Sequence, residues 1–323
     1  MTKKRKKVGV ALSGGGSKGI AHIGVLKILE KYNIPIDLVS GTSIGSVIGA
    51  LYCSGYSIKK LETLFTEDKR EWKKLFDYTF PKHGLIKGKK IEKFIEEELK
   101  DITFKELKKP LYVTAFDIEN RQEIYFNKGS VGKAVRASIS IPGIIVPVEN
   151  KKRILVDGGI VDPIPTEVLK KAGAEIIIAI NVNERDVKKP KFEKAVNKKG
   201  KKKVPGIWKI ASKSFKVMAY EVYMYDLTKE EIDFIIHVPT RNKDMMKFSK
   251  KDNKKAIKDG EKAAKKSLEE IQKATKEGPF KELLKNLEKL DEKMQKEKFK
   301  TLPSGNITKN PKKKIKEKDK RSV

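Results

Sequence analysis

Short apolar runs recur along the chain and are separated by stretches in which apolar residues have helical spacing. Short continuous runs of this kind are typical of strands that are buried on both faces of a parallel sheet. The predicted strands are residues 8–13, 36–40, 111–117, 144–148, 153–157 and 175–182, with another at 233–238. Because helical patterns lie between several of them, the chain predicts an α/β fold, a three-layer α/β/α sandwich with a mostly parallel central sheet.

The pattern divides the chain into four parts. Residues 7–183 hold most of the predicted strands and form the predicted core domain. Residues 184–206 combine lysine with proline and glycine, which predicts a flexible loop. Residues 207–272 predict a helix, a strand and a helix that complete the domain, and residues 273–323 predict a Lys-rich helix and a disordered tail. The aromatic and lysine side chains of residues 207–227 fit either a helix packed on the core or one at a lipid surface.

A serine flanked by glycines follows the second predicted strand, in Gly41-Thr42-Ser43-Ile44-Gly45. This G-x-S-x-G pattern is that of a nucleophile elbow, a crowded turn between a strand and a helix that exposes the serine hydroxyl. The pattern alone also fits an ordinary Gly/Ser turn. Since residues 46–54 are small and apolar and predict the required helix, we interpret Ser43 as a candidate nucleophile.

A glycine-rich loop follows the first predicted strand and begins a helical pattern. It consists of Gly14, Gly15, Gly16, Ser17, Lys18 and Gly19. A phosphate-binding P-loop is excluded because Lys18 precedes Gly19 and Ile20 follows it. A dinucleotide-binding loop matches the glycine spacing, but Asp37, the acidic residue near the expected offset, stands at the start of the second strand and not at its end.

The same loop is better suited to an oxyanion hole. Consecutive glycines let the backbone approach a substrate closely, and N–H groups at a helix N-terminus converge on developing negative charge. The predicted donors are Gly14, Gly15, Gly16 and Ser17. Lys18 either adds positive charge to this site or is a solvated loop lysine.

None of the three histidines of the chain is a good candidate for the base of a catalytic triad. His22 lies in the predicted helix after the glycine loop, His83 lies in a turn, and His237 lies in an apolar strand. Each is better explained as a structural or surface histidine.

A carboxylate offers an alternative base. The predicted strand at 153–157 ends in Asp157-Gly158-Gly159, which places a carboxylate at the carboxyl edge of the sheet, where open α/β folds build their sites. Asp-Gly-Gly is also an ordinary turn sequence. A carboxylate is a poor base at its usual pKa of about 3.9, so Asp157 requires partial burial or strong oxyanion stabilisation.

The glycine loop, the serine motif and the Asp-Gly-Gly turn, in this order, resemble the three signatures of the patatin-like phospholipase family. Residues 134–143 and Pro147-Val148 are similar to the segment before the family's aspartate, and Asp162-Pro163-Ile164-Pro165 resembles its continuation. The family more often has asparagine at the position of Asp162. The resemblance covers about residues 7–272 and implies a patatin-like fold with a catalytic core at residues 7–183.

The resemblance implies hydrolysis of phospholipid or lysophospholipid carboxylic esters through a Ser/Asp dyad. Ser43 is then the nucleophile that forms an acyl-enzyme, and Asp157 is the general base. The glycine-loop amides hold the oxyanion, without a cofactor or a metal. The residues that complete the motifs are Lys18, Gly19, Gly41, Gly45, Gly158 and Gly159. Alternatives are a non-lipid serine esterase or thioesterase of the same fold and, in another class, a nucleotide- or nucleic-acid-binding protein that uses the Gly-rich loop and the basic surface.

The formal net charge is +31, and lysines become more frequent after residue 187. A lysine near an anionic membrane contributes roughly 1 kcal/mol to binding, which predicts peripheral membrane association. We expect no nucleic-acid partner, because outside residues 207–225 the lysines are interleaved with glutamate and lack aromatic neighbours. Compositional drift of the source organism also explains a lysine bias.

The location that these features predict is the cytoplasm, with peripheral association at the inner face of the membrane. No apolar run reaches the length of about 18 residues that a membrane span needs, and no cleaved signal is expected. The single cysteine, Cys53, cannot form an internal disulfide and is expected to fill a buried position. The sequence leaves the oligomeric state open.

Overall fold

The computed structural model describes residues 5–67, 75–80, 83–150, 152–183, 218, 220–239 and 248–276. These residues all belong to one compact unit, residues 1–278. The predicted flexible loop at 184–206 lies outside the described residues, as does the predicted Lys-rich helix and tail at 273–323 beyond residue 276.

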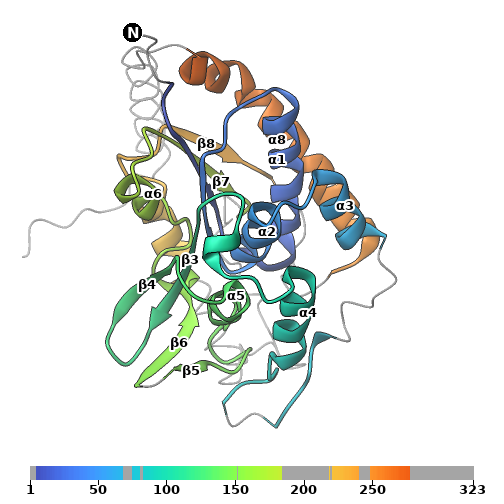
Figure 1. Cartoon of the computed structure of the whole chain (residues 1–323), viewed down its shortest axis with the longest axis vertical. Helices are drawn as coiled ribbons and strands as arrows, with labels where there is room; N and C mark the ends of the chain where they lie inside the picture. The colour runs from blue at the N-terminus through green and yellow to red at the C-terminus, as the bar shows by residue number, and fades with distance from the viewer. Residues whose placement is uncertain are drawn as a thin grey trace, which may run out of the picture. The chain divides into compact units, whose positions relative to one another are not determined.

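A mixed sheet of eight strands forms the centre of this unit (Figure 1). Its order is β5-β6-β3-β2-β1-β7-β8, and β4 pairs with β3 off this path. The strands are β1 (Val8–Leu12), β2 (Leu38–Thr42), β3 (Leu111–Asp117), β4 (Gln122–Phe126), β5 (Val148–Asn150), β6 (Arg153–Asp157), β7 (Ile176–Asn181) and β8 (Phe234–His237). The pairs from β3 to β8 along this order are parallel, whereas β4, β5 and β6 pair antiparallel.

Helices cover both faces of the sheet and give the three predicted layers (Figure 1). One face carries α1, α2, α5 and α8, and the other carries α6 and the helical residues 220–226. The helices are η1 (Gly16–Ile20), α1 (Ala21–Lys31), α2 (Ile44–Cys53), α3 (Ile58–Thr66), α4 (Lys89–Leu99), η3 (Phe104–Glu106), α5 (Val131–Ser138), η4 (Gly158–Ile160), α6 (Glu167–Lys171) and α8 (Lys250–Lys276), where η marks a 3-10 helix. The predicted fold class is confirmed.

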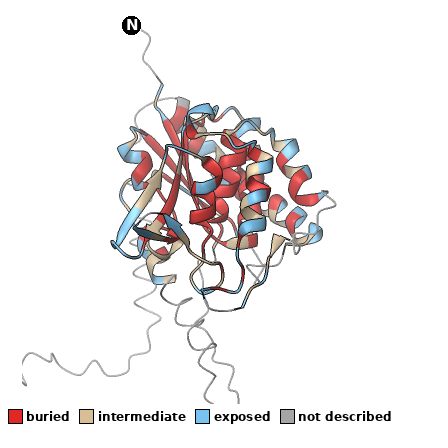
Figure 2. Ribbon diagram, turned by 60° about the horizontal axis from the view of Figure 1, so that its bottom comes forward, coloured by how far each residue is buried: buried red, intermediate tan, exposed pale blue. Residues whose placement is uncertain are grey.

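The core is concentrated in the sheet and the helices next to it, as the buried ribbons of Figure 2 show. Strands β1, β2 and β7 are buried along their whole length, because helices cover both of their faces. Tyr223, from the helical residues 220–226, packs with α6 and the sheet in a cluster around Ala11 and Ile177. The predicted buried position of Cys53 is confirmed.

Helix α8 packs along α1, far from it in the sequence (Figure 1). A glycine on each helix allows the two backbones to approach closely. A Cβ at Gly24 would collide with the carbonyl oxygen of Ile257, and a Cβ at Gly260 would collide with that of Ala21. Among the described helices, α8 included, none has both the length and the apolar composition of a membrane span.

The antiparallel part of the sheet differs from the prediction. β4 was not predicted, because its partly exposed residues do not form an apolar run. The predicted strand at 144–148 is wrong for most of its length, since β5 begins at Val148 and Ile145 makes only an isolated bridge with Ile86. β6 has the predicted position but runs antiparallel to β3.

The antiparallel pairing of β6 with β3 determines where Ser43 and Asp157 lie. Thr42, at the end of β2, pairs with Thr114 of β3, and Asp157, at the end of β6, pairs with the next residue, Ala115. β4 occupies the other edge of β3 at these positions, so β2 and β6 share one edge. The carboxyl ends of β2 and β6 therefore meet head to head, and the residues that follow Thr42 lie beside Asp157.

Candidate active site

Ser43 stands at the sharp turn between β2 and α2. Its backbone has φ 53° and ψ −125°, a conformation that is costly for any residue with a side chain. A Cβ at Gly41 would lie 2.5 Å from the carbonyl oxygen of Gly45, and a Cβ at Gly45 would collide with the carbonyl oxygen of Leu12. The two glycines of the motif are therefore required by the close approach of α2 to β1 and β2.

The elbow is fixed by hydrogen bonds on both sides of Ser43. Its N–H donates to Oγ of Ser138 at 2.8 Å, at the end of α5. Its carbonyl oxygen accepts from the N–H of Ser46 at 2.9 Å and from the Ser46 hydroxyl at 2.6 Å. Ser138 was not singled out from the sequence, although it lies in the stretch 134–143 that carried part of the family resemblance.

The Ser43 side chain interacts with the Asp157 carboxylate, and the two residues are only 7% and 5% exposed. The Gly159 N–H donates to Oδ1 of this carboxylate at 2.8 Å. Burial raises the pKa of Asp157 to about 6, and the hydrogen bonds from Ser43 and Gly159 oppose part of that rise. Asp157 forms no ion pair within the described part of the chain. A buried carboxylate with this pKa is well matched to accept a proton near neutral pH.

The glycine loop lies beside the nucleophile, since a Cβ at Gly14 would be 3.5 Å from Cβ of Ser43. Gly15 has φ 152° and Gly16 has φ 59°, which turns the backbone into η1. No hydrogen bond of the Gly15 or Gly16 N–H to another described residue is found. The N–H groups of Gly15 and Gly16 are thus not used by a hydrogen bond to the described part of the fold. Ser17 is buried and Lys18 is half-buried in the same short helix.

The structure corrects one member of the predicted oxyanion hole. The N–H of Gly14 donates to the carbonyl oxygen of Pro163 at 3.0 Å. This amide connects the end of β1 to the loop after Asp157, so it is used by the fold and is not free to bind a substrate. The sequence did not show this because the two segments meet only in the folded chain.

The remaining glycines of the motifs allow close packing around Ser43 and Asp157. A Cβ at Gly19 would collide with the side chain of Ile44, and a Cβ at Gly158 would lie 2.7 Å from Cγ2 of Thr114. A Cβ at Gly159 would lie 3.1 Å from the Asp157 carboxylate. Larger residues at these positions would displace η1, β3 or the base.

An apolar cavity of about 100 Å³ begins at Ser43. Its polar edge is formed by Ser43 and Gly16, and the rest of its wall is apolar. The apolar lining consists of Ile44, Val47, Phe65, Leu75, Phe76, Ile91, Phe94, Ile95, Ile139, Ile141, Ile145 and Phe248. Such a lining accommodates apolar groups.

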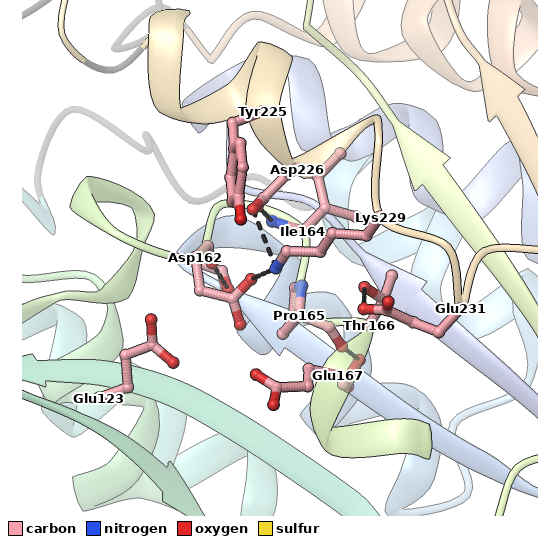
Figure 3. Close-up of polar contacts among 12 residues, drawn as sticks. Glu123, Asp162, Ile164, Pro165, Thr166, Glu167, Tyr225, Asp226, Lys229 and Glu231 are labelled. Carbon is pink, nitrogen blue, oxygen red and sulfur yellow. Dashed lines mark hydrogen bonds and ion pairs between the residues drawn. The ribbon is translucent and has the colours of Figure 1, made fainter. Parts of the chain in front are cut away.

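Other charged side chains surround Asp162 (Figure 3). Lys229 Nζ lies 3.0 Å from Oδ1 of Asp162 and 2.9 Å from Oδ1 of Asp226. The other oxygens accept from the Tyr125 hydroxyl at 2.9 Å and from the Ile164 N–H at 3.0 Å. Burial and the nearby Asp162 raise the pKa of Asp226. Burial lowers the pKa of Lys229, but the attraction of both carboxylates outweighs it, so the net shift is upward.

This charge cluster, Asp162, Asp226 and Lys229, connects residues that are distant in the sequence to the strand ends of the site. The Thr42 hydroxyl donates to the carbonyl oxygen of Asp162 at 2.9 Å. The Gly14 amide contacts the next residue, Pro163. No motif in the sequence pointed to Asp226 or Lys229, because their role depends on a tertiary contact.

The histidines have the expected structural or surface positions. His22 is buried, its Nε2 lies 2.9 Å from the carbonyl oxygen of Ser13, and burial lowers its pKa to about 4. His237 contacts the Asn181 side chain at 2.8 Å, and His83 is exposed. In the described part of the chain, no group of His, Cys, Asp and Glu residues could hold a metal ion.

Asp37, the residue considered for ribose binding, is engaged elsewhere. Its carboxylate accepts two hydrogen bonds of 2.6 Å from the Arg5 guanidinium and one of 2.8 Å from the Val8 N–H. These contacts place it before β2, at the opposite end of that strand from Ser43. The geometry therefore gives no support to a dinucleotide site at the glycine loop.

Comparison with known proteins finds a matching family model and related sequences. A family model described as patatin-like phospholipase matches residues 10–170. The chain is 36% identical over 189 residues to neuropathy target esterase sws of Drosophila melanogaster, and 34% identical over 192 residues to lysophospholipase NTE1 of Candida albicans. These matches cover 55% and 57% of this chain but only 13% and 14% of the two relatives.

Among solved structures, VipD from Legionella pneumophila is similar, with a TM-score of 0.49 and 16% sequence identity. The similarity covers 83% of this chain and 67% of that one.

Proposed function

The chain carries a patatin-like phospholipase domain at residues 10–170, and we propose that it hydrolyses carboxylic esters of phospholipids or lysophospholipids. The observation that carries this proposal is the interaction of buried Ser43 with buried Asp157 at one end of an apolar cavity. The names of the two relatives, an esterase and a lysophospholipase, agree with an ester of this class.

In the proposed acylation step, Ser43 Oγ attacks the ester carbonyl carbon while Asp157 accepts the hydroxyl proton. Because Asp157 Oδ1 already accepts from Gly159, Oδ2 is the oxygen assigned to the proton. The carbonyl electron pair moves onto oxygen, and the amides of Gly15 and Gly16 stabilise the resulting oxyanion. Loss of one such donor typically costs about 3 kcal/mol of barrier.

The tetrahedral intermediate then collapses, and the C–O bond to the leaving alcohol breaks. Asp157 returns its proton to that alcohol oxygen, which leaves the acyl group on Ser43. In the second half of the cycle, water attacks the acyl carbonyl carbon while Asp157 accepts a proton from the water. The C–O bond to Ser43 Oγ then breaks, Asp157 returns the proton to Ser43 Oγ, and the fatty acid leaves. Without a histidine to share the proton, the pKa of Asp157 limits the fraction of active enzyme at acidic pH.

The cavity supports a lipid rather than a small polar ester. Apart from Ser43 and Gly16 its lining is apolar, so burial of an acyl chain stabilises the complex by about 0.8 kcal/mol for each buried CH₂ group. A non-lipid ester or a thioester presents the same carbonyl to Ser43 but gains less from this wall.

Labelling with a fluorophosphonate probe and peptide mapping tests the nucleophile. We expect label on Ser43 in the unaltered chain, loss of label in Ser43→Ala, and strongly slowed labelling in Asp157→Asn. Ser54→Ala is the matched control, because Ser54 follows the same helix but its hydroxyl donates to the Leu51 carbonyl oxygen at 2.8 Å. Label that persists in Ser43→Ala would refute the mechanism.

The substrate class is tested with lysophosphatidylcholine and lysophosphatidylglycerol, by measuring released fatty acid. We expect turnover that rises with acyl-chain length until the cavity is filled. Rapid labelling by the probe without fatty-acid release from either lipid would contradict the lipid assignment and favour another ester.

A further inference from the structure

Large apolar side chains are exposed on the loop between α3 and α4. Tyr78 is 74% exposed, Phe80 is 82% exposed and Leu85 is 48% exposed. The loop lies at the lower end of the molecule in the view of Figure 1, next to α4. Aromatic residues seldom remain this exposed, and a cluster of them marks an interaction surface more often than a random feature of the surface.

Backbone hydrogen bonds hold the described residues of this loop on either side of residues 81–82. The Thr79 N–H donates to the Leu85 carbonyl oxygen, and the Lys87 N–H donates to the Asp77 carbonyl oxygen, both at 2.9 Å. The Leu85 N–H also donates to the Ile144 carbonyl oxygen at 2.9 Å. The loop therefore presents Tyr78 and Leu85 to solvent on a fixed backbone.

The other side of the same segment forms part of the cavity. Leu75, Phe76 and Ile91 line the cavity together with Ser43. Ile86 is buried and pairs with Ile145, which is also a cavity residue. The same segment thus contributes both exposed apolar side chains and apolar side chains that line the cavity with Ser43.

Three exposed lysines follow these apolar side chains. They are Lys87, Lys89 and Lys90, at and before the start of α4. None of them forms an ion pair with a described residue. Aromatic side chains next to exposed lysines match the two layers of a lipid surface, an apolar interior below anionic headgroups.

We propose that Tyr78, Phe80 and Leu85, with Lys87, Lys89 and Lys90, form a docking surface that enters an anionic lipid interface and opens the cavity toward it. The identity of the partner as lipid rests on the proposed function. The apolar side chains enter the acyl region while the lysines contact headgroup phosphates. A lipid then reaches Ser43 along the apolar surface with its acyl chain out of water.

Sedimentation with phosphatidylglycerol vesicles tests this surface directly. All chains carry Ser43→Ala, so that lipid is not consumed during the measurement. We expect the double variant Tyr78→Ser, Phe80→Ser to weaken vesicle binding by about tenfold or more, because two aromatic side chains no longer leave water. Tyr225→Ser is the matched control, since Tyr225 is 71% exposed but lies elsewhere, and it should change binding less than about twofold.

The charge part of the surface has its own test. Replacing Lys87, Lys89 and Lys90 by Gln should weaken binding by about 100-fold at low salt and much less at high salt, because screening already removes the lysine contribution there. Equal binding of the aromatic double variant and the control would overturn the proposal. So would the absence of any vesicle binding at low salt.

A soluble short-chain ester separates this proposal from the proposed function. With Ser43 intact, the aromatic double variant should hydrolyse that ester at the normal rate and vesicle lipid about tenfold more slowly. If the unaltered chain hydrolyses neither substrate, the proposed function fails while the vesicle-binding assay still tests the surface. If the double variant instead turns a dimer into a monomer in analytical ultracentrifugation, the surface binds a second copy and the lipid assignment is wrong.

Discussion

Asp157 and Asp162 lie on the same stretch of chain and are both buried, but their surroundings are opposite. Asp157 contacts the Ser43 hydroxyl and the Gly159 amide and has no ion pair among the described residues. Asp162 and Asp226 are each 1% exposed and share the ammonium of Lys229 at 3.0 and 2.9 Å. Asp157 therefore has no described cation to compensate its charge, whereas the two carboxylates of the cluster share one.

We therefore expect Asp157 to act in catalysis and Asp162 to stabilise the fold. An unpaired carboxylate with a raised pKa can take a proton from Ser43, at a cost in folding stability. The charge cluster supplies rigidity close by, because Asp162 and Pro163 hold the ends of β2 and β1 through Thr42 and Gly14. Variants of the two regions should therefore fail in different ways.

The largest expected effect is on catalysis. Asp157→Asn and Ser43→Ala should each lower kcat/KM by about 10⁴-fold or more, because the two residues act as one unit. Asp157→Asn should leave the free energy of unfolding unchanged or raise it, since it removes an unpaired buried charge. Fatty-acid release and urea denaturation at pH 7.5 measure both quantities. A loss of stability above about 2 kcal/mol would mean that Asp157 also supports the fold.

The next effect is on stability. Lys229→Met leaves two buried carboxylates without their cation and should lower the free energy of unfolding by about 3–5 kcal/mol in urea at pH 7.5. The labelling rate of Ser43 in the fraction that stays folded should change far less.

The triple variant Lys229→Met, Asp162→Asn, Asp226→Asn is the control for this charge effect. It removes the uncompensated charges together with the lysine, so it should recover much of the lost stability. Equal losses in the single and triple variants would show that packing of the lysine stem matters more than its charge.

The pH dependence of hydrolysis and of folding stability distinguishes Asp157 from the charge cluster further. Hydrolysis should rise with pH and level off above an inflection near the Asp157 pKa of about 6, because only the carboxylate form accepts the proton. The folded pKa lies above the unfolded value of 3.8, so this group favours folding fully below pH 3.8. That contribution is lost as the pH rises through about 6, a change of about 3 kcal/mol.

A pH–rate profile and urea denaturation between pH 4 and pH 8 measure these changes. Asp157→Asn should remove this part of the stability slope and provides the control. An inflection in the rate that stays near pH 4 would contradict the buried, unpaired state of Asp157.

The smallest effect is expected for Asp162→Asn. Asparagine is the residue that the family resemblance suggests at this position. An asparagine keeps the backbone contact with Thr42 and an oxygen for Lys229, while one lysine then faces one carboxylate, Asp226. The free energy of unfolding should change by less than about 1 kcal/mol, and the inflection of the rate should stay near 6. A loss as large as that of Lys229→Met would show that both carboxylates are needed.

The sequence predicted the residues whose role is visible in a local pattern. Gly41 and Gly45 identify the turn at Ser43 because the crowding that excludes a side chain acts within a few residues of the motif. Lys229 and Ser138 were missed, because each becomes important only through a contact made after folding. The antiparallel direction of β6 was missed for the same reason: its apolar run shows burial but not the direction of its partner.

The head-to-head meeting of β2 and β6 on β3 has an evolutionary consequence. The spacing of Ser43 and Asp157 is counted in whole residues, since a slip of β6 by one residue moves Asp157 by about 3.3 Å and turns its side chain to the other face. Insertions in the turns around β4 and β5 leave this count unchanged, whereas an insertion within β6 destroys it. Substitutions can thus change the surface and the cavity gradually, whereas a single change in the register of β6 separates Asp157 from Ser43.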